Sequence, residues 1–141
     1  MKIVIDSNVF VSSFYYAGNP RKVFDRVTNG LDELFITDDI LTEIVSVMSR
    51  DKFASNIDEI EAYIKIIESY SIKLSAKNVL QNVSRDKDDN KILQCAMDGN
   101  ADFIITGDKD LLVLQEFKEI KIVKPSDYLE IIKRNHRLTH D

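Results

Sequence analysis

The sequence is poor in cysteine and histidine, which limits the ways in which this protein could be stabilised or bind metals. Cys95 is the only cysteine in the 141 residues, so an intramolecular disulfide is excluded. It lies in a helical pattern, where a free cysteine is usually a small buried apolar residue. His136 and His140 are the only histidines, and both lie near the polar end of the chain. The absence of a Cys/His cluster argues against a zinc site.

Long apolar runs and an excess of positive charge are also missing. No run approaches the roughly 20 apolar residues of a membrane-spanning helix, and the N-terminus lacks the zones of a signal peptide. We therefore expect a cytoplasmic protein that does not enter a membrane. The net charge of −5 argues against nucleic-acid binding through a general basic surface. However, the balance is 19 basic against 24 acidic residues. If five acids gathered in one site, the rest would be neutral, so a nuclease is not excluded.

The order of apolar patterns predicts one α/β domain. Short apolar runs, typical of buried strands, alternate with stripes at helical spacing. This alternation predicts a three-layer sandwich, with a central, mostly parallel sheet and helices on both faces. The expected strands are 2–5, 34–37, 72–74, 103–105 and 120–123. The expected helices are 9–14, 20–29, 40–50, 56–70, 92–98 and 125–132, and Gly99 is a natural helix stop.

Three segments do not fit this alternation. Residues 79–83 are ambiguous, and residues 85–91 are expected to form a charged loop. The polar end of the chain is expected to fray, so we predict a domain over 1–133 and a polar tail over 134–141. The cations of residues 133–137 could touch the phosphates of a nucleic acid, but a solvated tail is the simpler interpretation.

Two of the expected strands run directly into carboxylates. The first is followed by Asp6-Ser7-Asn8, and the strand 103–105 is followed by Thr106-Gly107-Asp108-Lys109-Asp110. The carboxyl ends of parallel strands share one sheet edge, where ligand and metal sites of open α/β sheets lie. A purely structural interpretation also exists, because Asp6 and Asp108 could each cap the helix that follows.

Two further acids lie on apolar helical stripes. Glu43 falls between Ile40 and Val47 at helical spacing, and Asp89 has Ile92 on the same face. A carboxylate on an inward face is unfavourable unless it is paired or binds a metal. Asp89 could instead be the N-cap of its helix, whereas Glu43 lies mid-helix and has no such alternative.

Carboxylates that converge on one sheet edge would repel one another. A hard divalent cation removes that conflict. Because the candidate ligands are all oxygen atoms, the pattern favours Mg²⁺ or Mn²⁺.

These motifs, in this order and at these separations, resemble the PIN domain. The strings DDNK at 88–91 and TGDKDLL at 106–112 more closely resemble the PIN domains that are toxins of toxin–antitoxin systems, the VapC-like ribonucleases. The resemblance spans the chain to about Lys133. It implies a metal-dependent ribonuclease that acts on RNA and is held inactive by a small antitoxin protein, in a family where homodimers are common.

The resemblance also implies roles for individual residues. The catalytic and metal-binding acids would be Asp6, Glu43, Asp89 and Asp108. The supporting residues would be Ser7, Asn8, Thr106 and Asp110, the last as an additional acid. Asp86 and Asp88 compete with Asp89 for the third acidic position, and the helical register favours Asp89.

Other functions fit parts of the pattern. A different metal-dependent phosphoesterase is one. A phosphatase with Asp6 as nucleophile would usually have a second acid two residues later, where this chain has Asn8. A phosphorylated receiver domain needs an acidic pair after the first strand, and Asp6 stands alone there. In a non-catalytic protein-binding module the acids would only cap helices. Cooperative Mn²⁺ binding that raises the melting temperature would exclude that last function.

Overall fold

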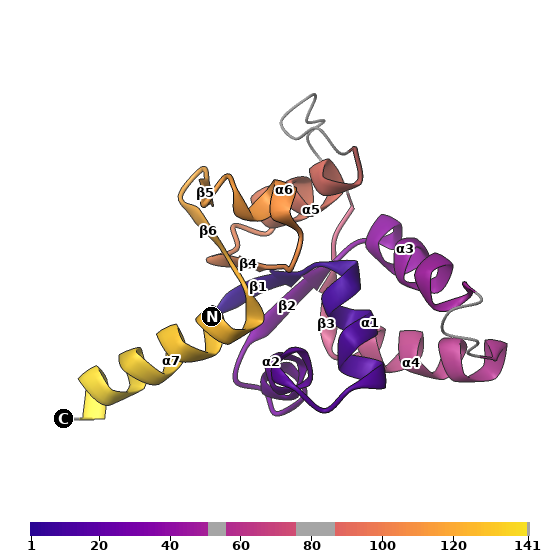
Figure 1. Ribbon diagram of the computed structural model, residues 1–141, viewed down its shortest axis with the longest axis horizontal. Coiled ribbons are helices and arrows are strands. Elements are labelled where there is room, and N and C mark those ends of the chain that lie inside the picture. The colour runs from indigo at the N-terminus through magenta and orange to yellow at the C-terminus, as the bar shows by residue number, and fades with distance from the viewer. Residues whose placement is uncertain (51–55, 76–86, 141) are drawn as a thin grey trace.

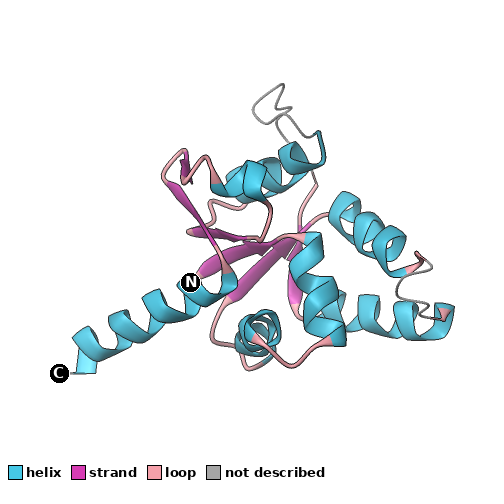
Figure 2. Cartoon of the chain, viewed as in Figure 1, coloured by secondary structure: helices cyan, strands magenta, loops and turns pink. Residues whose placement is uncertain are grey.

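A computed structural model of the chain describes residues 1–50, 56–75 and 87–140, and it contains one central sheet with helices on both faces (Figure 1; Figure 2). The strands are β1 (Lys2–Ile5), β2 (Glu33–Ile36), β3 (Ser71–Lys73), β4 (Phe103–Ile105), β5 (Glu116–Phe117) and β6 (Ile120–Val123). Their order across the sheet is β3-β2-β1-β4-β6-β5. All neighbouring strands are parallel except β5 and β6. The predicted three-layer α/β architecture is therefore confirmed.

The helices enclose the sheet from two sides. They are α1 (Ser7–Tyr15), α2 (Asn19–Thr28), α3 (Asp38–Met48), α4 (Ile57–Ser69), α5 (Lys87–Asp98), α6 (Lys109–Leu112) and α7 (Pro125–His140). Helix α5 packs against β1, β2 and β4, and α1, α2 and α7 lie on the opposite side of the sheet (Figure 1). Residues 87–91 belong to α5, so the expectation that they form a charged loop is wrong. Residues 79–83 and 85–86 lie outside the described part of the chain.

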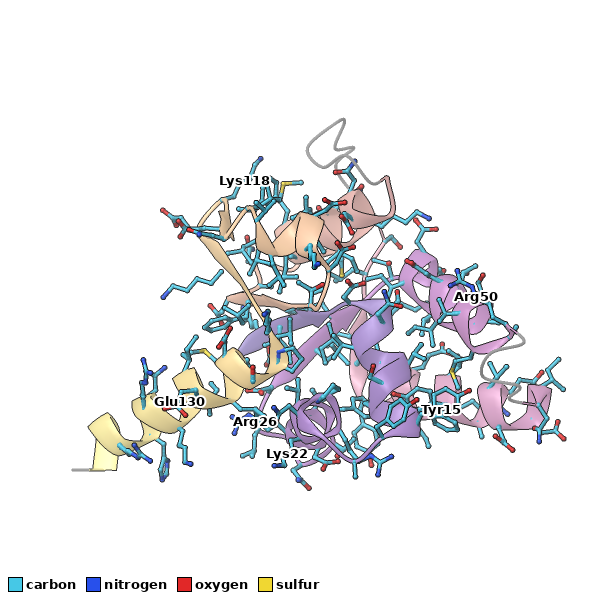
Figure 3. The ribbon with its side chains drawn as sticks, in the orientation of Figure 1. Tyr15, Lys22, Arg26, Arg50, Lys118 and Glu130 are labelled. Carbon is cyan, nitrogen blue, oxygen red and sulfur yellow. The ribbon has the colours of Figure 1, made fainter. Side chains whose placement is uncertain are left out.

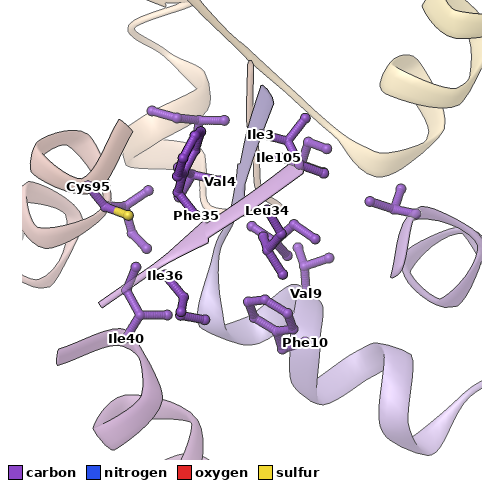
Figure 4. Packing of buried hydrophobic residues seen from close by; sticks show 14 of the residues in the cluster. Ile3, Val4, Val9, Phe10, Leu34, Phe35, Ile36, Ile40, Cys95 and Ile105 are labelled. Carbon is purple, nitrogen blue, oxygen red and sulfur yellow. The ribbon is translucent and has the colours of Figure 1, made fainter. Parts of the chain in front are cut away.

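The central strands form the middle of the core. Ile3 and Val4 of β1 are buried, as are Leu34 and Phe35 of β2 (Figure 4). Ile5 of β1 is also buried. These strands are apolar without alternation because helices cover both faces of the sheet. Burying one such side chain fully stabilises the fold by about 1.5–3 kcal/mol. The buried strands therefore hold the residues that follow them in fixed positions.

Gly99 has a packing role besides ending a helix. A Cβ atom at this position would lie 2.8 Å from Cγ of the Phe35 ring, closer than real contacts allow. The residue after α5 with left-handed backbone is Asn100, with a φ of 50°. The glycine therefore lets the end of α5 approach β2.

The sequence patterns do not predict the β5–β6 hairpin. Its turn consists of Lys118 and Glu119, with φ values of 48° and 70°. Turns with two left-handed residues usually contain glycine, asparagine or aspartate. The sequence therefore carries no turn signal here, although β6 itself is an expected strand.

Helix α7 continues through the segment expected to fray and ends at His140. Its C-terminal half extends away from the rest of the chain (Figure 1). The residues from Lys133 to Arg137 are exposed, and Arg134 forms an ion pair of 3.4 Å with Glu130 one turn earlier. Within the described ranges, no helix is both long and apolar enough to cross a membrane.

A buried carboxylate at the amino edge of the sheet joins α2 and α7 to β2. Asp32 directly precedes β2, and its side chain is fully buried. It accepts hydrogen bonds from Nε of Arg26 (labelled in Figure 3) and from the hydroxyl of Tyr128, each at 2.8 Å. Burial alone would raise the pKa of Asp32, but these hydrogen bonds outweigh it and hold the pKa below its usual value.

Candidate metal centre

Strands β1 and β4 are parallel neighbours, so the residues that follow them meet at the carboxyl edge of the sheet. The backbone N–H of Asp6 donates to the carbonyl of Ile105 at 3.0 Å, which fixes Asp6 beside the end of β4. Asp6 is 5% exposed. It stands at the N-cap of α1 but makes no side-chain capping hydrogen bond. Capping therefore does not explain the presence of an acid at this position.

Thr106 connects the ends of the two strands. It is fully buried, and its hydroxyl donates to Oδ2 of Asp6 at 2.7 Å. The Thr106 hydroxyl oxygen also accepts a hydrogen bond from the backbone N–H of Asp108 at 3.0 Å. Because a hydroxyl has one hydrogen to donate, this arrangement commits it to Asp6 and orients that carboxylate.

Asp108 begins the short helix α6, as its capping interpretation predicts. Its Oδ1 accepts a hydrogen bond from the backbone N–H of Asp110 at 2.8 Å. The bond engages one carboxylate oxygen and leaves Oδ2 outside the cap. Capping and metal binding are therefore compatible in this residue.

Asp89 reaches the same place from α5. It lies in the first turn of that helix rather than at its N-cap, and it is 3% exposed. Carboxylate oxygens of Asp89, Asp108 and Asp110 all lie within 4.8 Å of one another. The sequence alone gives Asp110 a supporting role, whereas the structure places it beside Asp89 and Asp108. We call these three residues the acidic group.

The other candidate residues lie outside the acidic group. Glu43 is half-buried between Ile40 and Ile44 on α3, as the apolar stripe predicts, but is not a member of the group formed by the described residues. Asn8 is exposed. Asp86 and the side chain of Asp88, the competitors of Asp89, are beyond what the structure describes.

Ser7 adds a separate feature beside Asp6. It is fully buried, and its hydroxyl has no hydrogen-bond partner within the described chain. Leaving a buried polar group without a partner costs roughly 1–3 kcal/mol. A ligand with oxygen atoms could satisfy this hydroxyl.

The donor set of the acidic group fits a hard divalent cation. It offers three carboxylates close enough to share one ion, and Mg²⁺ and Mn²⁺ prefer oxygen ligands of this kind. The buried Ser7 hydroxyl, which follows Asp6 in the chain and has no hydrogen-bond partner among the described residues, is consistent with a ligand that brings water or phosphate oxygens. Asp89, Asp108 and Asp110 are thus the residues whose geometry could hold a metal.

The fold and the acidic group together define a class of protein, an open and mostly parallel α/β sheet with an acidic site at the carboxyl edge of its central strands. The family model for the PIN domain matches residues 2–110 of this chain. That range includes Asp6, Glu43 and the acidic group. The chain belongs to the PIN-domain family.

Two known proteins are similar to this chain, one in sequence and one in fold. It is similar to the uncharacterized protein MJ1680 of Methanocaldococcus jannaschii, with 30% identity over an alignment that covers 92% of this chain and 90% of that protein. Its fold is similar to a chain in the crystal structure of VapBC2 from Rickettsia felis bound to a DNA fragment from their promoter. That match has a TM-score of 0.57 and 14% identity, and covers 86% of this chain and 97% of the other. At such low identity the likeness concerns the fold alone.

Proposed function

We propose that this PIN-domain protein is a ribonuclease that depends on Mg²⁺ or Mn²⁺ and hydrolyses RNA phosphodiester bonds. The observation that carries the proposal is the acidic group, whose three carboxylates approach within 4.8 Å at the carboxyl edge of the sheet. The hydrogen-bond chain from Asp108 through Thr106 to Asp6 connects a fourth acid to it.

In this proposal Asp6, Glu43, Asp89 and Asp108 hold the metal, and Asp110 joins them. A bound divalent cation would supply a water of lowered pKa and neutralise charge on the leaving oxygen. The chain itself supplies orientation. Thr106 fixes the Asp6 carboxylate through a 2.7 Å hydrogen bond, and the cap of α6 fixes Asp108 through one of 2.8 Å. Ser7 and Asn8 follow Asp6 directly and would support bound water or phosphate.

Asp6→Asn tests the proposed site. This change keeps the shape of the side chain and the hydrogen bond from Thr106 but removes the negative charge. We expect RNA cleavage in Mg²⁺ or Mn²⁺ to fall by at least about 100-fold, as it does when one electrostatic contact of a transition state is lost. The matched control is Asp25→Asn on the exposed surface of α2, which should cut at the parental rate. If Asp6→Asn cut RNA as fast as the parent, the site would be wrong.

Metal binding can be measured without any substrate. Mn²⁺ that binds only the folded state raises the melting temperature in a concentration-dependent way. We expect this rise for the parent and for Asp25→Asn, and a smaller one for Asp6→Asn. A protein-binding module in which the acids only cap helices would show no rise.

We further propose that the ribonuclease is the cytoplasmic toxin of a toxin–antitoxin pair. The support is the resemblance of the DDNK and TGDKDLL strings to such toxins and the fold likeness to a chain of Rickettsia felis VapBC2. The partners would be an RNA substrate, a small antitoxin and, as in many relatives, a second copy of the chain. Expression of the parent, but not of Asp6→Asn, should arrest growth, and a small protein encoded beside it should restore growth. The absence of arrest would contradict the toxin role and leave the nuclease proposal intact.

A further inference from the structure

A cavity opens at the carboxyl edge of the sheet, over the ends of β2 and β3. We call it the α3–α5 cavity. Its floor includes Thr37, which follows β2, and Leu74, which follows β3 and donates its backbone N–H to the carbonyl of Ile36 at 2.8 Å. Helix α5 contributes Lys91, Gln94 and Asp98 to its wall. The cavity volume is about 240 Å³, below the usual range for drug-sized ligands. Its size therefore suits a single flat ring.

Helix α5 connects this cavity to the acidic group, and helix α3 connects it to Glu43. On α5, Asp89 belongs to the acidic group and Gln94 lines the cavity. Gln94 lies five positions after Asp89, which is about 7.5 Å along a helix axis. On α3, Asp39 lines the cavity, and Glu43 lies one turn further on the same face. A single RNA strand whose phosphodiester lies at the acidic group would pass over the cavity with a neighbouring nucleotide.

The charges of the cavity favour a base over a phosphate. Its lining carries the carboxylates of Asp38, Asp39 and Asp98 against the single ammonium of Lys91. Lys73 pairs with Asp38 at 2.7 Å and reduces this excess, but the lining remains acidic. An anionic phosphate would be repelled there, whereas N–H donors would be attracted. Sequence-specific proteins commonly read the edges of unpaired RNA bases in this way.

The hydrogen-bonding groups of the cavity favour adenine and cytosine over uracil. Carboxylates accept hydrogen bonds from the exocyclic amino group of cytosine, and a glutamine amide pairs with the N6 and N7 atoms of adenine. Uracil has no amino group, and its single N–H on that edge lies between two carbonyl oxygens that would approach the carboxylates. The half-buried Gln94 is the neutral side chain of the cavity that can both donate and accept through a planar amide.

We propose that the α3–α5 cavity is a subsite for the base of a nucleotide next to the cleaved bond, and that it prefers bases with an exocyclic amino group over uracil. This inference rests on the proposed ribonuclease function. Gln94 is its specificity residue and takes no part in the hydrolysis itself.

The test compares Gln94→Met with the parent on short single-stranded homopolymers of adenylate, cytidylate and uridylate. Gln94→Met keeps the charge and approximate length of the side chain and removes the amide. We expect the parent to cut adenylate about tenfold faster than uridylate, because a bidentate base contact is worth about 1–3 kcal/mol. In Gln94→Met this ratio should fall several-fold, while cleavage of uridylate and the melting temperature change little. Lys65→Met, at an exposed position of α4, is the control that should keep the parental ratio.

Binding of the same RNAs to Asp6→Asn, measured by fluorescence anisotropy, gives a readout independent of cleavage and should show the same order of preference. Equal cleavage of all three RNAs by the parent, or an unchanged ratio in Gln94→Met, would overturn the base subsite. A parent that cuts none of the RNAs would overturn the proposed ribonuclease instead. In that case the ratio of adenylate to uridylate affinity from fluorescence anisotropy, with and without Gln94→Met, still tests whether the cavity binds a base.

Discussion

Asp32 and Asp6 are both buried aspartates beside the central sheet, at opposite edges and with different surroundings. At the amino edge, Asp32 accepts hydrogen bonds from a guanidinium and a phenol. At the carboxyl edge, Asp6 accepts one from Thr106, which is linked to Asp108. Asp108 in turn lies within 4.8 Å of two further acids. One edge matches a carboxylate with donors, and the other gathers carboxylates together.

The difference separates two uses of the same side chain. A buried carboxylate matched by donors ties segments of the fold together, whereas grouped carboxylates disfavour one another's charge unless a cation joins them. We therefore expect the amino edge to control stability and the carboxyl edge to control ligand binding and chemistry.

The largest effect on stability should come from Asp32→Ala. The change leaves Arg26 beside a buried gap and Tyr128 without its hydrogen-bond acceptor. Breaking a buried ion pair costs about 3–5 kcal/mol, and because Arg26 is partly exposed we expect the lower end, about 3 kcal/mol. Urea denaturation measures it, with Asp25→Ala on the exposed side of α2 as the control. A loss below about 1 kcal/mol would contradict the expectation that the amino edge controls stability.

Tyr128→Phe should have a smaller effect at the same edge. It removes the 2.8 Å hydrogen bond to Asp32 and keeps the ring, which packs edge-on against Phe103. Hydrogen bonds to charged groups contribute about 1.5–3 kcal/mol, and Arg26 still pairs with the carboxylate. We expect a loss near about 1.5 kcal/mol by urea denaturation. An unchanged midpoint would mean that Arg26 and the N-terminal ammonium of Met1, which lies 3.2 Å from Oδ1, satisfy Asp32 without the phenol.

The pH dependence of stability offers a third comparison. The pKa of Asp32 is lower in the folded chain than its ordinary value. The stabilisation from this group is therefore fully present above its unfolded pKa, about 3.9, and is lost as the pH falls through the folded pKa. Asp32→Asn should flatten the decline in unfolding free energy below about pH 4. If the unfolding free energies of parent and variant declined in parallel, the Asp32 carboxylate would not be the source of the pH dependence.

Asp108→Asn should have the smallest effect on folding. Asparagine caps helices as well as aspartate does, so the metal-free unfolding free energy should change by less than about 0.5 kcal/mol. The increase in melting temperature with Mn²⁺ should be much smaller than in the parent, because one carboxylate of the acidic group is lost. Equal stabilisation of both proteins by Mn²⁺ would place the metal elsewhere.

The features that follow from local pattern were predictable from the sequence. Period and composition predict the central strands, and the acids that follow β1 and β4 reach one edge because parallel strands share their direction. Asp89 and Glu43 are predictable as inward-facing because helical spacing sets the face. The α6 cap at Asp108 is predictable from its position alone.

The features that depend on tertiary contacts were not predictable. Asp32 carries no periodic signal, and its partner Tyr128 is 96 residues away. The nearness of Asp110 to Asp89 depends on how α6 turns beside α5. The contact that requires Gly99 is with a ring on β2, and the β5–β6 turn uses Lys118 and Glu119 where a glycine would have been a signal.

The hydrogen bond between Thr106 and Asp6 joins residues that are 100 positions apart in the chain, and this separation has a consequence for synthesis. A growing chain that ends before β4 has Asp6 but neither Thr106 nor Asp108, so it cannot assemble the acidic edge. Contacts of such separation also form late in refolding, since loop closure must precede them. With the ribonuclease function proposed above, a nascent chain would therefore be unable to cleave the RNA around it until synthesis has passed Asp108.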